Sequence, residues 1–294
     1  MIFMDLRVLR YFLAVAREQN ITAAANSLHI SQPTLSRQLM ELEAEFGKTL
    51  MIRGNRKISL TNEGRLLRKR AEELIALADK TKAEMTLSDA EIGGDIYIGG
   101  GEADAFRLIA KLAKTIQADY PNVNYHLISG DADDLSEKLD KGLLDFCVFV
   151  EPADITKYEF IRLPATERWG IVTRKDSSLA GKTVISPKDI WDLPLIISRQ
   201  TEQDKIIQKW LQKDMSRLNI VATYNLYYNA GLMVEEGVGY MIGIDKLADT
   251  GGDLCFIPLD LDYEIHFDLV WKKYQTFSRA AELFLSKANV EIGE

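Results

Sequence analysis

The spacing of hydrophobic residues predicts three helices at the start of the chain. In residues 6–19 an apolar side chain recurs every third or fourth position, which places these side chains on one face of a helix. Residues 21–30 are rich in alanine and favour a short second helix, for which Thr22 is a suitable N-cap. Residues 30–43 predict a third helix with Ser31 as its N-cap, because a serine hydroxyl accepts a hydrogen bond from first-turn amides.

The third helix is expected to be apolar on one side and polar on the other. Leu35, Leu39 and Leu42 face inward, and the short polar side chains between them are expected to face solvent. A tight turn followed by such a helix is typical of a helix-turn-helix, although other small helical domains share the pattern. Arg37 is the best candidate for a phosphate or guanine contact. The candidate DNA-contact residues of this region are Thr22, Ser31, Gln32, Pro33, Thr34, Ser36, Arg37 and Gln38.

A basic hairpin is predicted within residues 46–64. Arg53, Arg56 and Lys57 flank a Gly54-Asn55 pair, which favours a tight turn between two short strands. A basic hairpin alone is often only a solvated turn. Beside a recognition helix, however, it is expected to act as a wing that contacts phosphates or the minor groove.

Residues 62–88 predict one long helix with a heptad seam. Apolar and small residues alternate there by four and three positions, as in a coiled coil. An amphipathic helix that packs on its own domain is the alternative. Because only the short N-terminal head adjoins this helix, we expect it to pair two chains. The seam consists of Leu67, Ala71, Leu74, Ala78, Thr81 and Met85.

From residue 92 onward, apolar strand-like segments alternate with helical ones. This alternation predicts an α/β fold with mainly parallel sheets. The expected strands are 95–99, 124–129, 144–150, 168–173, 194–198, 220–225, 239–243 and 265–271. The expected helices are 104–119, 133–141, 202–214, 230–236 and 277–289.

The charge distribution changes how the net charge of −8 is interpreted. Residues 1–88 hold 14 basic and 10 acidic side chains, whereas the remainder holds 22 basic and 34 acidic ones. A basic head on an acidic body is compatible with DNA contact through the head alone.

The composition bears on compartment and cofactors. Cys147 and Cys255 lie in apolar stretches and are expected to be buried thiols, which fits a reducing cytoplasm. The three histidines have no metal-ligand spacing, so neither a metal nor another cofactor is expected. No apolar run is long enough for a membrane helix, and the N-terminus has no signal-peptide core.

Several short motifs, in order, identify a family. The segment 6–64 resembles the winged helix-turn-helix of LysR-type transcriptional regulators. The motifs that carry the resemblance are LRYF (9–12), TAAA (22–25), LHISQPTLSRQL (28–39) and LTNEG (60–64). The remainder is similar to the sensor part of that family, through DIYIG (95–99), GLLDFCV (142–148) and EEGVGYMIG (235–243). The resemblance also suggests Met4 as the native start.

The resemblance implies an α+β multi-domain fold. It implies a winged helix-turn-helix in residues 1–61, a linker and dimerisation helix in residues 62–91, and a sensor domain in residues 92–294. The sensor would be a two-lobed α/β domain like a periplasmic binding protein. Its first lobe would comprise about 92–162 and 267–294, and its second lobe about 163–266. Family members are typically homotetramers, built as dimers of dimers, that bind promoter DNA.

An unknown small-molecule effector would bind between these lobes. Family members often carry Ser or Thr at the start of the first sensor helix, where this chain has Gly100, Gly101 and Glu102. Glu102 would repel an anion if it faced the cleft. By position, the expected effector contacts are Gly100, Gly101, Glu102, Ser129, Ser198, Arg199, Tyr227 and Asn229.

Other classes of protein fit less well. An enzyme is not expected, because the glycine-rich segment 93–102 matches neither a dinucleotide-binding motif nor a P-loop. A secreted solute-binding protein would have a signal and no DNA-binding head. Oxidant sensing is disfavoured because the loop 198–206 contains no cysteine. A constitutive regulator without effector response stays open.

Overall fold

The computed structural model describes residues 4–54, 57–86, 92–247 and 252–293, without the side chains of residues 202 and 203. The chain divides into two compact units, Met1–Thr86 and Leu87–Glu294. Each unit is described separately below. No helix among the described residues is long and apolar enough to cross a membrane.

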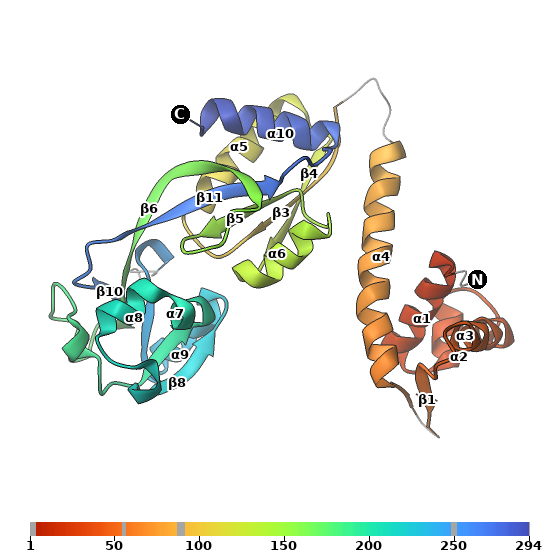
Figure 1. The fold of residues 1–294 in the computed structure, drawn as a ribbon, viewed down its shortest axis with the longest axis horizontal. Helices are drawn as coiled ribbons and strands as arrows, with labels where there is room; N and C mark the ends of the chain where they lie inside the picture. Colours follow the sequence, from red (N-terminus) through yellow and green to blue (C-terminus); the bar gives the residue numbers. More distant parts are fainter. Residues whose placement is uncertain (1–3, 55–56, 87–91, 248–251, 294) are drawn as a thin grey trace. The chain divides into compact units, whose positions relative to one another are not determined.

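The first unit is a helical head with a small hairpin and a long helix (Figure 1). Its elements are α1 (Leu6–Glu18), α2 (Ile21–Ser27), α3 (Gln32–Phe46), β1 (Met51–Arg53), β2 (Ile58–Leu60) and α4 (Asn62–Thr86). Phe12, Leu35 and Leu39 are fully buried and form the centre of its core. The hairpin pairs Met51 with Leu60 in an antiparallel register. The three helices, the hairpin and the long helix expected from the sequence are therefore all present.

The N-cap of α2 differs from the sequence expectation, whereas the N-cap of α3 agrees with it. Asn20, not Thr22, caps α2, because its side chain accepts a hydrogen bond from the amide of Ala23 at 2.9 Å. Thr22 lies one residue inside the helix. Ser31 caps α3 as expected, and its hydroxyl accepts from the amide of Thr34 at 3.3 Å.

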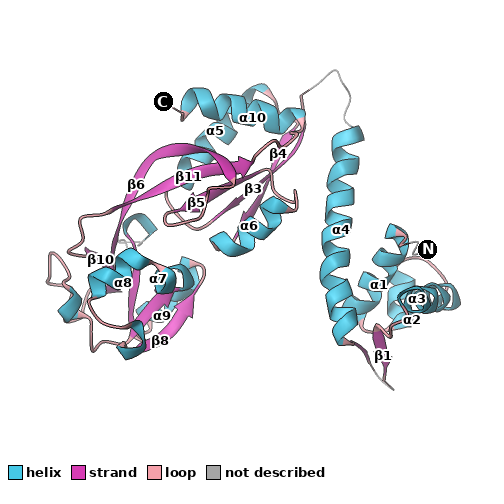
Figure 2. Ribbon diagram, viewed as in Figure 1, coloured by secondary structure: helices cyan, strands magenta, loops and turns pink. Residues whose placement is uncertain are grey.

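The second unit is built on a sheet of nine strands with helices on both sides (Figure 2). The strands are β3 (Gly94–Gly100), β4 (Val123–Ser129), β5 (Phe146–Val150), β6 (Tyr158–Arg174), β7 (Leu195–Ser198), β8 (Ile220–Tyr224), β9 (Tyr240–Ile244), β10 (Leu254–Pro258) and β11 (Glu264–Lys272). The helices are α5 (Phe106–Asp119), α6 (Ala132–Asp140), α7 (Arg199–Gln203), α8 (Lys205–Leu211), α9 (Tyr227–Glu235) and α10 (Arg279–Glu291).

Two long strands join two lobes of this sheet. The order is β4-β3-β5-β11-β6-β9-β7-β8, and β10 pairs with β6 outside that path. We call the part with β3, β4, β5, α5, α6 and α10 the first lobe, and the part with β7, β8, β9, β10, α7, α8 and α9 the second lobe. In the first lobe, α5 and α10 pack on one face of β3 while α6 packs on the other.

The sheet is mixed rather than mainly parallel. Pairs within each lobe, β3 with β4 and β7 with β8, are parallel, as expected. The pairs that join the lobes, such as β6 with β11 and β6 with β9, are antiparallel. Strands β6 and β11 are thus antiparallel to each other and to the lobe strands β9 and β5 that they pair with.

Three elements of the sensor differ from the sequence expectation. Strand β6 is 17 residues long and begins at Tyr158, where only residues 168–173 were expected. Strand β10 was missed. The expected helix 202–214 is two helices, because the side chain of Asp204 accepts from the amide of Ile206 at 2.7 Å and starts α8 anew.

Candidate nucleic-acid interface and interlobe cleft

The N-terminal half of α3 presents the polar surface that the sequence predicts. Gln32, Pro33, Thr34 and Arg37 are exposed, and their positions follow directly after the cap at Ser31. First-turn amides and short polar side chains are thus available to phosphates and base edges. Arg37 has the longest reach of this group, with 70% of its side chain exposed.

Ser36 is a correction, because its side chain lies on the packed side of α3. Its exposed fraction is 9%, and its hydroxyl accepts a hydrogen bond from the side-chain amide of Gln32 at 2.8 Å. One helical turn separates it from both Gln32 and Leu39, so it lies nearer the apolar stripe than the outer face. Its hydroxyl therefore orients Gln32 instead of facing the groove.

Glu41 contacts two of the predicted DNA-contact residues. Its carboxylate lies 3.7 Å from the guanidinium of Arg37 and accepts a hydrogen bond from Gln38 at 2.7 Å. Both charged side chains of the Arg37 pair are largely exposed. Exposed pairs of this kind contribute about 1 kcal/mol or less, so Arg37 can exchange Glu41 for a phosphate or base at little cost.

Glu43 has a positioning role that the sequence interpretation missed. Its carboxylate oxygen Oε1 accepts hydrogen bonds from the amides of Leu50 at 2.7 Å and Met51 at 3.1 Å. It thereby fastens the start of β1 to α3. A signal for this role would be an acidic residue late in a helix directly before a hairpin, but its amide partners are not visible in sequence.

The hairpin presents two of its three predicted basic residues within the described part of the chain. Arg53 at the end of β1 and Lys57 before β2 are both exposed. Arg56 lies outside the described residues. With Glu43 fixing the start of the hairpin, these side chains are held beside α3.

The predicted seam on α4 is partly used inside the head. Leu67 packs against the core of the head and Ala71 is fully buried there. Farther along, Leu74 is 38% exposed and Met85 is 80% exposed, and Thr81 is exposed. Ala78 is partly exposed. Of the predicted seam, the residues available to another chain therefore start at Leu74.

A cavity of about 890 Å³ opens between the two lobes. The first lobe contributes an acidic wall that includes Asp131, Asp133 and Asp154. The second lobe contributes Arg199 and Lys205. Arg199 is exposed, as an anion-binding or solvated arginine would be. Lys157 and Asp204 also line the cavity, so it offers charges of both signs to a ligand.

A second pocket of about 300 Å³ lies at the end of β3 in the first lobe. Four of the predicted effector residues, Gly100, Gly101, Glu102 and Ser129, line it together with apolar side chains. The carboxylate oxygen Oε2 of Glu102 also accepts hydrogen bonds from the amides of Tyr227 and Tyr228 in the second lobe, the latter at 3.3 Å. The structure therefore brings Glu102 and Tyr227 together.

Two predicted effector residues are placed elsewhere. The hydroxyl of Ser198 accepts from the amide of Thr201 at 2.9 Å and caps α7. Asn229 is exposed on α9 and lines neither of the two cavities.

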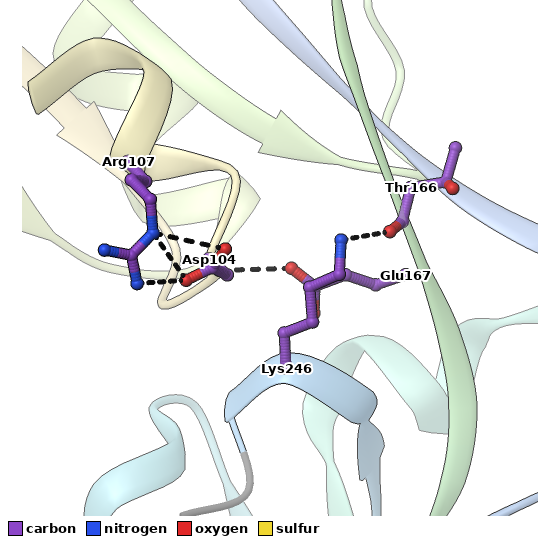
Figure 3. A network of polar contacts seen from close by, with 5 residues as sticks. All are labelled: Asp104, Arg107, Thr166, Glu167 and Lys246. Carbon is purple, nitrogen blue, oxygen red and sulfur yellow. Dashed lines mark hydrogen bonds and ion pairs between the residues drawn. The ribbon is translucent and has the colours of Figure 1, made fainter. Parts of the chain in front are cut away.

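A buried carboxylate connects the lobes near this turn. Glu167 on β6 is 1% exposed, and its oxygen Oε1 accepts a hydrogen bond from the amide of Asp104 at 3.1 Å (Figure 3). Its other oxygen is buried and has no hydrogen-bond partner among the described residues. Burial, and then the nearby carboxylate of Asp245, raise the pKa of Glu167 to about 7. The ammonium of Lys246, from the second lobe, bonds to the carbonyl of Thr166 at 2.8 Å.

Both cysteines are free thiols. Cys147 is fully buried in the first lobe, and burial raises its pKa to about 12. Cys255 on β10 is partly exposed. No group of three possible metal ligands gathers within the described part of the chain.

Two family models match the chain. The model for the bacterial regulatory helix-turn-helix protein, lysR family, matches residues 6–65. The model for the LysR substrate binding domain matches residues 90–288.

Individual relatives agree with these matches. The transcriptional regulator BudR of Raoultella terrigena is 32% identical over 96% of this chain and 99% of its own length. The regulator BsdA of Bacillus subtilis is 31% identical over 74% of each chain. The crystal structure of full-length CbnR with its target DNA superposes with a TM-score of 0.75 at 19% identity, covering 98% of this chain and all of CbnR.

Proposed function

Because the chain belongs to the LysR family of bacterial DNA-binding transcriptional regulators, we propose that it binds promoter DNA in a sequence-specific way and that a small molecule bound between its lobes changes this binding. Residues 1–61 would bind DNA, residues 62–91 would pair two chains, and residues 92–294 would bind the effector. The protein would act in the cytoplasm, without enzymatic activity.

The exposed polar start of α3 carries the DNA part of the proposal. Gln32, Thr34 and Arg37 are exposed in the N-terminal half of α3, and Glu43 attaches the wing to the same helix. A recognition helix that presents its N-terminal residues to the major groove reads bases with such side chains. Gln38 reaches this face when it releases Glu41. Arg53 and Lys57 would hold the backbone beside the groove.

Pairing through α4 sets the geometry of the operator. The apolar side chains exposed from Leu74 onward, including Leu77 at 40% exposure, would pack against those of a second copy. Two heads related by a two-fold axis would then recognise an operator that is roughly two-fold symmetric. Assembly of two such dimers into a tetramer is the arrangement we propose for the full regulator.

The interlobe cavity supports effector binding. It is lined by both lobes, so a ligand there would contact two parts of the fold and shift the balance between two lobe arrangements. Arg199 would hold an acidic group of the ligand, and the acidic wall an amino group. A constitutive regulator without a ligand is the alternative, and it would have no use for such a cavity.

Footprinting tests the proposal. We expect the protein to protect a roughly two-fold symmetric site upstream of a gene, and an effector to change the length of the protected region. A thermal-shift screen of metabolites finds the effector, because a ligand at 100 times its dissociation constant stabilises its target by about 2.7 kcal/mol. A footprint that no ligand alters, and a screen in which nothing stabilises the protein, would favour the constitutive regulator.

A further inference from the structure

Helix α9 begins without a cap of its own. Its N-cap residue is Leu226, which has no side-chain acceptor, and no side-chain cap bond forms there. The first amides of a helix lack partners within the helix and need an acceptor from elsewhere. These amides, with the helix dipole, favour a negative charge at this end.

Glu102 of the first lobe supplies that charge to the second lobe. Its carboxylate oxygen Oε2 accepts from the amides of Tyr227 and Tyr228, the first two residues of α9. Its other oxygen, Oε1, forms no hydrogen bond with the part of the chain that the structure describes. The side chain is half-buried, so the contact is partly shielded from water.

The local sequence favours this contact of Glu102 with the second lobe. Glu102 follows three consecutive glycines, Gly99 to Gly101, at the end of β3, and a Cβ atom on Gly100 would lie only 3.0 Å from the ring of Phe106. A larger residue there would push the turn and the ring apart. The glycines therefore let the turn approach α5 closely and place Glu102 at the edge of the lobe.

We propose that Glu102 determines which ligands the pocket at the end of β3 accepts, by occupying the position on α9 that a carboxylate ligand would otherwise take. The inference rests on the proposed function, since it concerns the small-molecule effector of the same two-lobed domain. A carboxylate ligand has to displace Glu102 and gains only what that side chain already provides. A ligand with a neutral or cationic hydrogen-bond donor gains Oε1 of Glu102 as an acceptor instead.

The adjoining pocket has matching chemistry. It is lined by the apolar side chains of Ile98, Phe106 and Leu127, by the hydroxyl of Ser129, and by Glu102 as its only charged residue among the described ones. Its volume of about 300 Å³ suits a small metabolite. The ligand class is thus a small molecule with an apolar body and an amide, hydroxyl or amino donor, and without a carboxylate at this position.

Acetate is the probe that tests the role of Glu102. Removing the side chain in Glu102→Ala leaves the amides of α9 beside a space that acetate fits. We expect acetate to raise the Tm of Glu102→Ala in a saturable way and to bind it about tenfold more tightly than wild type, at constant ionic strength. Acetamide, a neutral molecule of the same shape, is expected to leave both proteins unchanged.

The matched control is Glu159→Ala. Glu159 is an exposed glutamate of β6 whose side chain forms no hydrogen bond with the described residues. Its alanine variant is expected to respond to acetate as wild type does. An equal response of wild type and Glu102→Ala to acetate would overturn the proposal. The absence of any response from Glu102→Ala would overturn it as well, because the end of α9 would then have no preference for a carboxylate.

Hydrogen exchange gives a second readout if Glu102→Ala folds poorly. In Glu102→Gln the side chain keeps its size but loses its charge, so we expect the amides of Tyr227 and Tyr228 to exchange several times faster than in wild type. Unchanged exchange contradicts the proposal. Neither experiment involves DNA or the effector, so their failure leaves the regulatory proposal standing, and a failure to bind DNA leaves this one untouched.

Discussion

Glu167 accepts a hydrogen bond from the amide of Asp104 at 3.1 Å, although the two residues are 63 positions apart in the chain. The contact joins strand β6 to the turn that precedes α5 in the first lobe (Figure 3). On its other side, Glu167 is close to the charges of Asp245 and Lys246 from the second lobe. One buried carboxylate thus faces groups of both lobes.

The raised pKa of Glu167 predicts a pH-dependent stability. In the folded protein the pKa is about 7, above the ordinary 4.5, so the folded state holds the proton more tightly than the unfolded one. The stability from this group is fully present below pH 4.5 and is lost as the pH rises through 7. Between pH 6 and pH 8 we expect the free energy of unfolding to fall by about 1 kcal/mol because of Glu167.

Denaturant unfolding of wild type and Glu167→Gln measures this loss. The glutamine variant is expected to have a shallower pH dependence over the same range, because it cannot ionise. The free energy of unfolding of the variant, relative to that of wild type, is therefore expected to be higher at pH 8 than at pH 6. Parallel pH profiles for the two proteins would show that Glu167 does not titrate there.

Glu43 is predicted to hold the wing in place. Glu43→Ala removes the acceptor of two amides and should lower the free energy of unfolding by about 1–3 kcal/mol. We expect the amides of Leu50 and Met51 to exchange faster with solvent, and DNA affinity to fall. Glu43→Gln keeps an acceptor oxygen but loses the charge, so its exchange rates are expected to fall between those of wild type and the alanine variant. Exchange in Glu43→Ala equal to that in wild type would mean that the wing is positioned by other contacts.

The exposed end of α4 is predicted to form the dimer interface. Leu74→Glu puts a charge on the apolar surface at the point where it leaves the head, so the dimer should dissociate at concentrations where wild type stays paired. Light scattering after size exclusion gives the mass directly. Lys82→Glu reverses a charge at an exposed position that is not one of the seam residues, and this variant should stay dimeric. If both variants keep the mass of wild type, chains pair through another surface.

The local features of the head could be predicted from sequence because they depend on neighbours along the chain. Ser31 caps α3 and Leu35 and Leu39 form the core, as the helical spacing indicates. The wrong predictions for the head arise where neighbouring residues are about equally suited to the same role or position. Asn20 and Thr22 are both good caps, and packing selected Asn20. Ser36 lies at the boundary of the apolar stripe and is buried there, where its hydroxyl accepts a hydrogen bond from Gln32.

The sensor was less predictable because its contacts are distant in sequence. Alternating elements indicated an α/β fold, and the family resemblance implied its two lobes. The length of β6, however, follows from its pairing with β11, about a hundred residues later. The bond between Glu102 and the amide of Tyr227 spans 125 residues. The sequence shows that a glutamate follows three glycines, but not that its carboxylate contacts a helix of the other lobe.

Fluorescence anisotropy with labelled promoter DNA tests the central claim most directly. The labelled DNA is the region upstream of the protein's own gene, compared with unrelated DNA of equal length across a salt series. The variant is Arg37→Ala. Arg68→Ala is the matched control, because Arg68 also forms an exposed pair with a glutamate four residues later.

We expect wild type and Arg68→Ala to prefer the promoter fragment strongly. Arg37→Ala should lose about 1–3 kcal/mol of that preference, roughly a tenfold to hundredfold loss of specific affinity. If wild type binds no DNA even at low salt, where phosphate contacts are strongest, the protein is not a DNA-binding regulator.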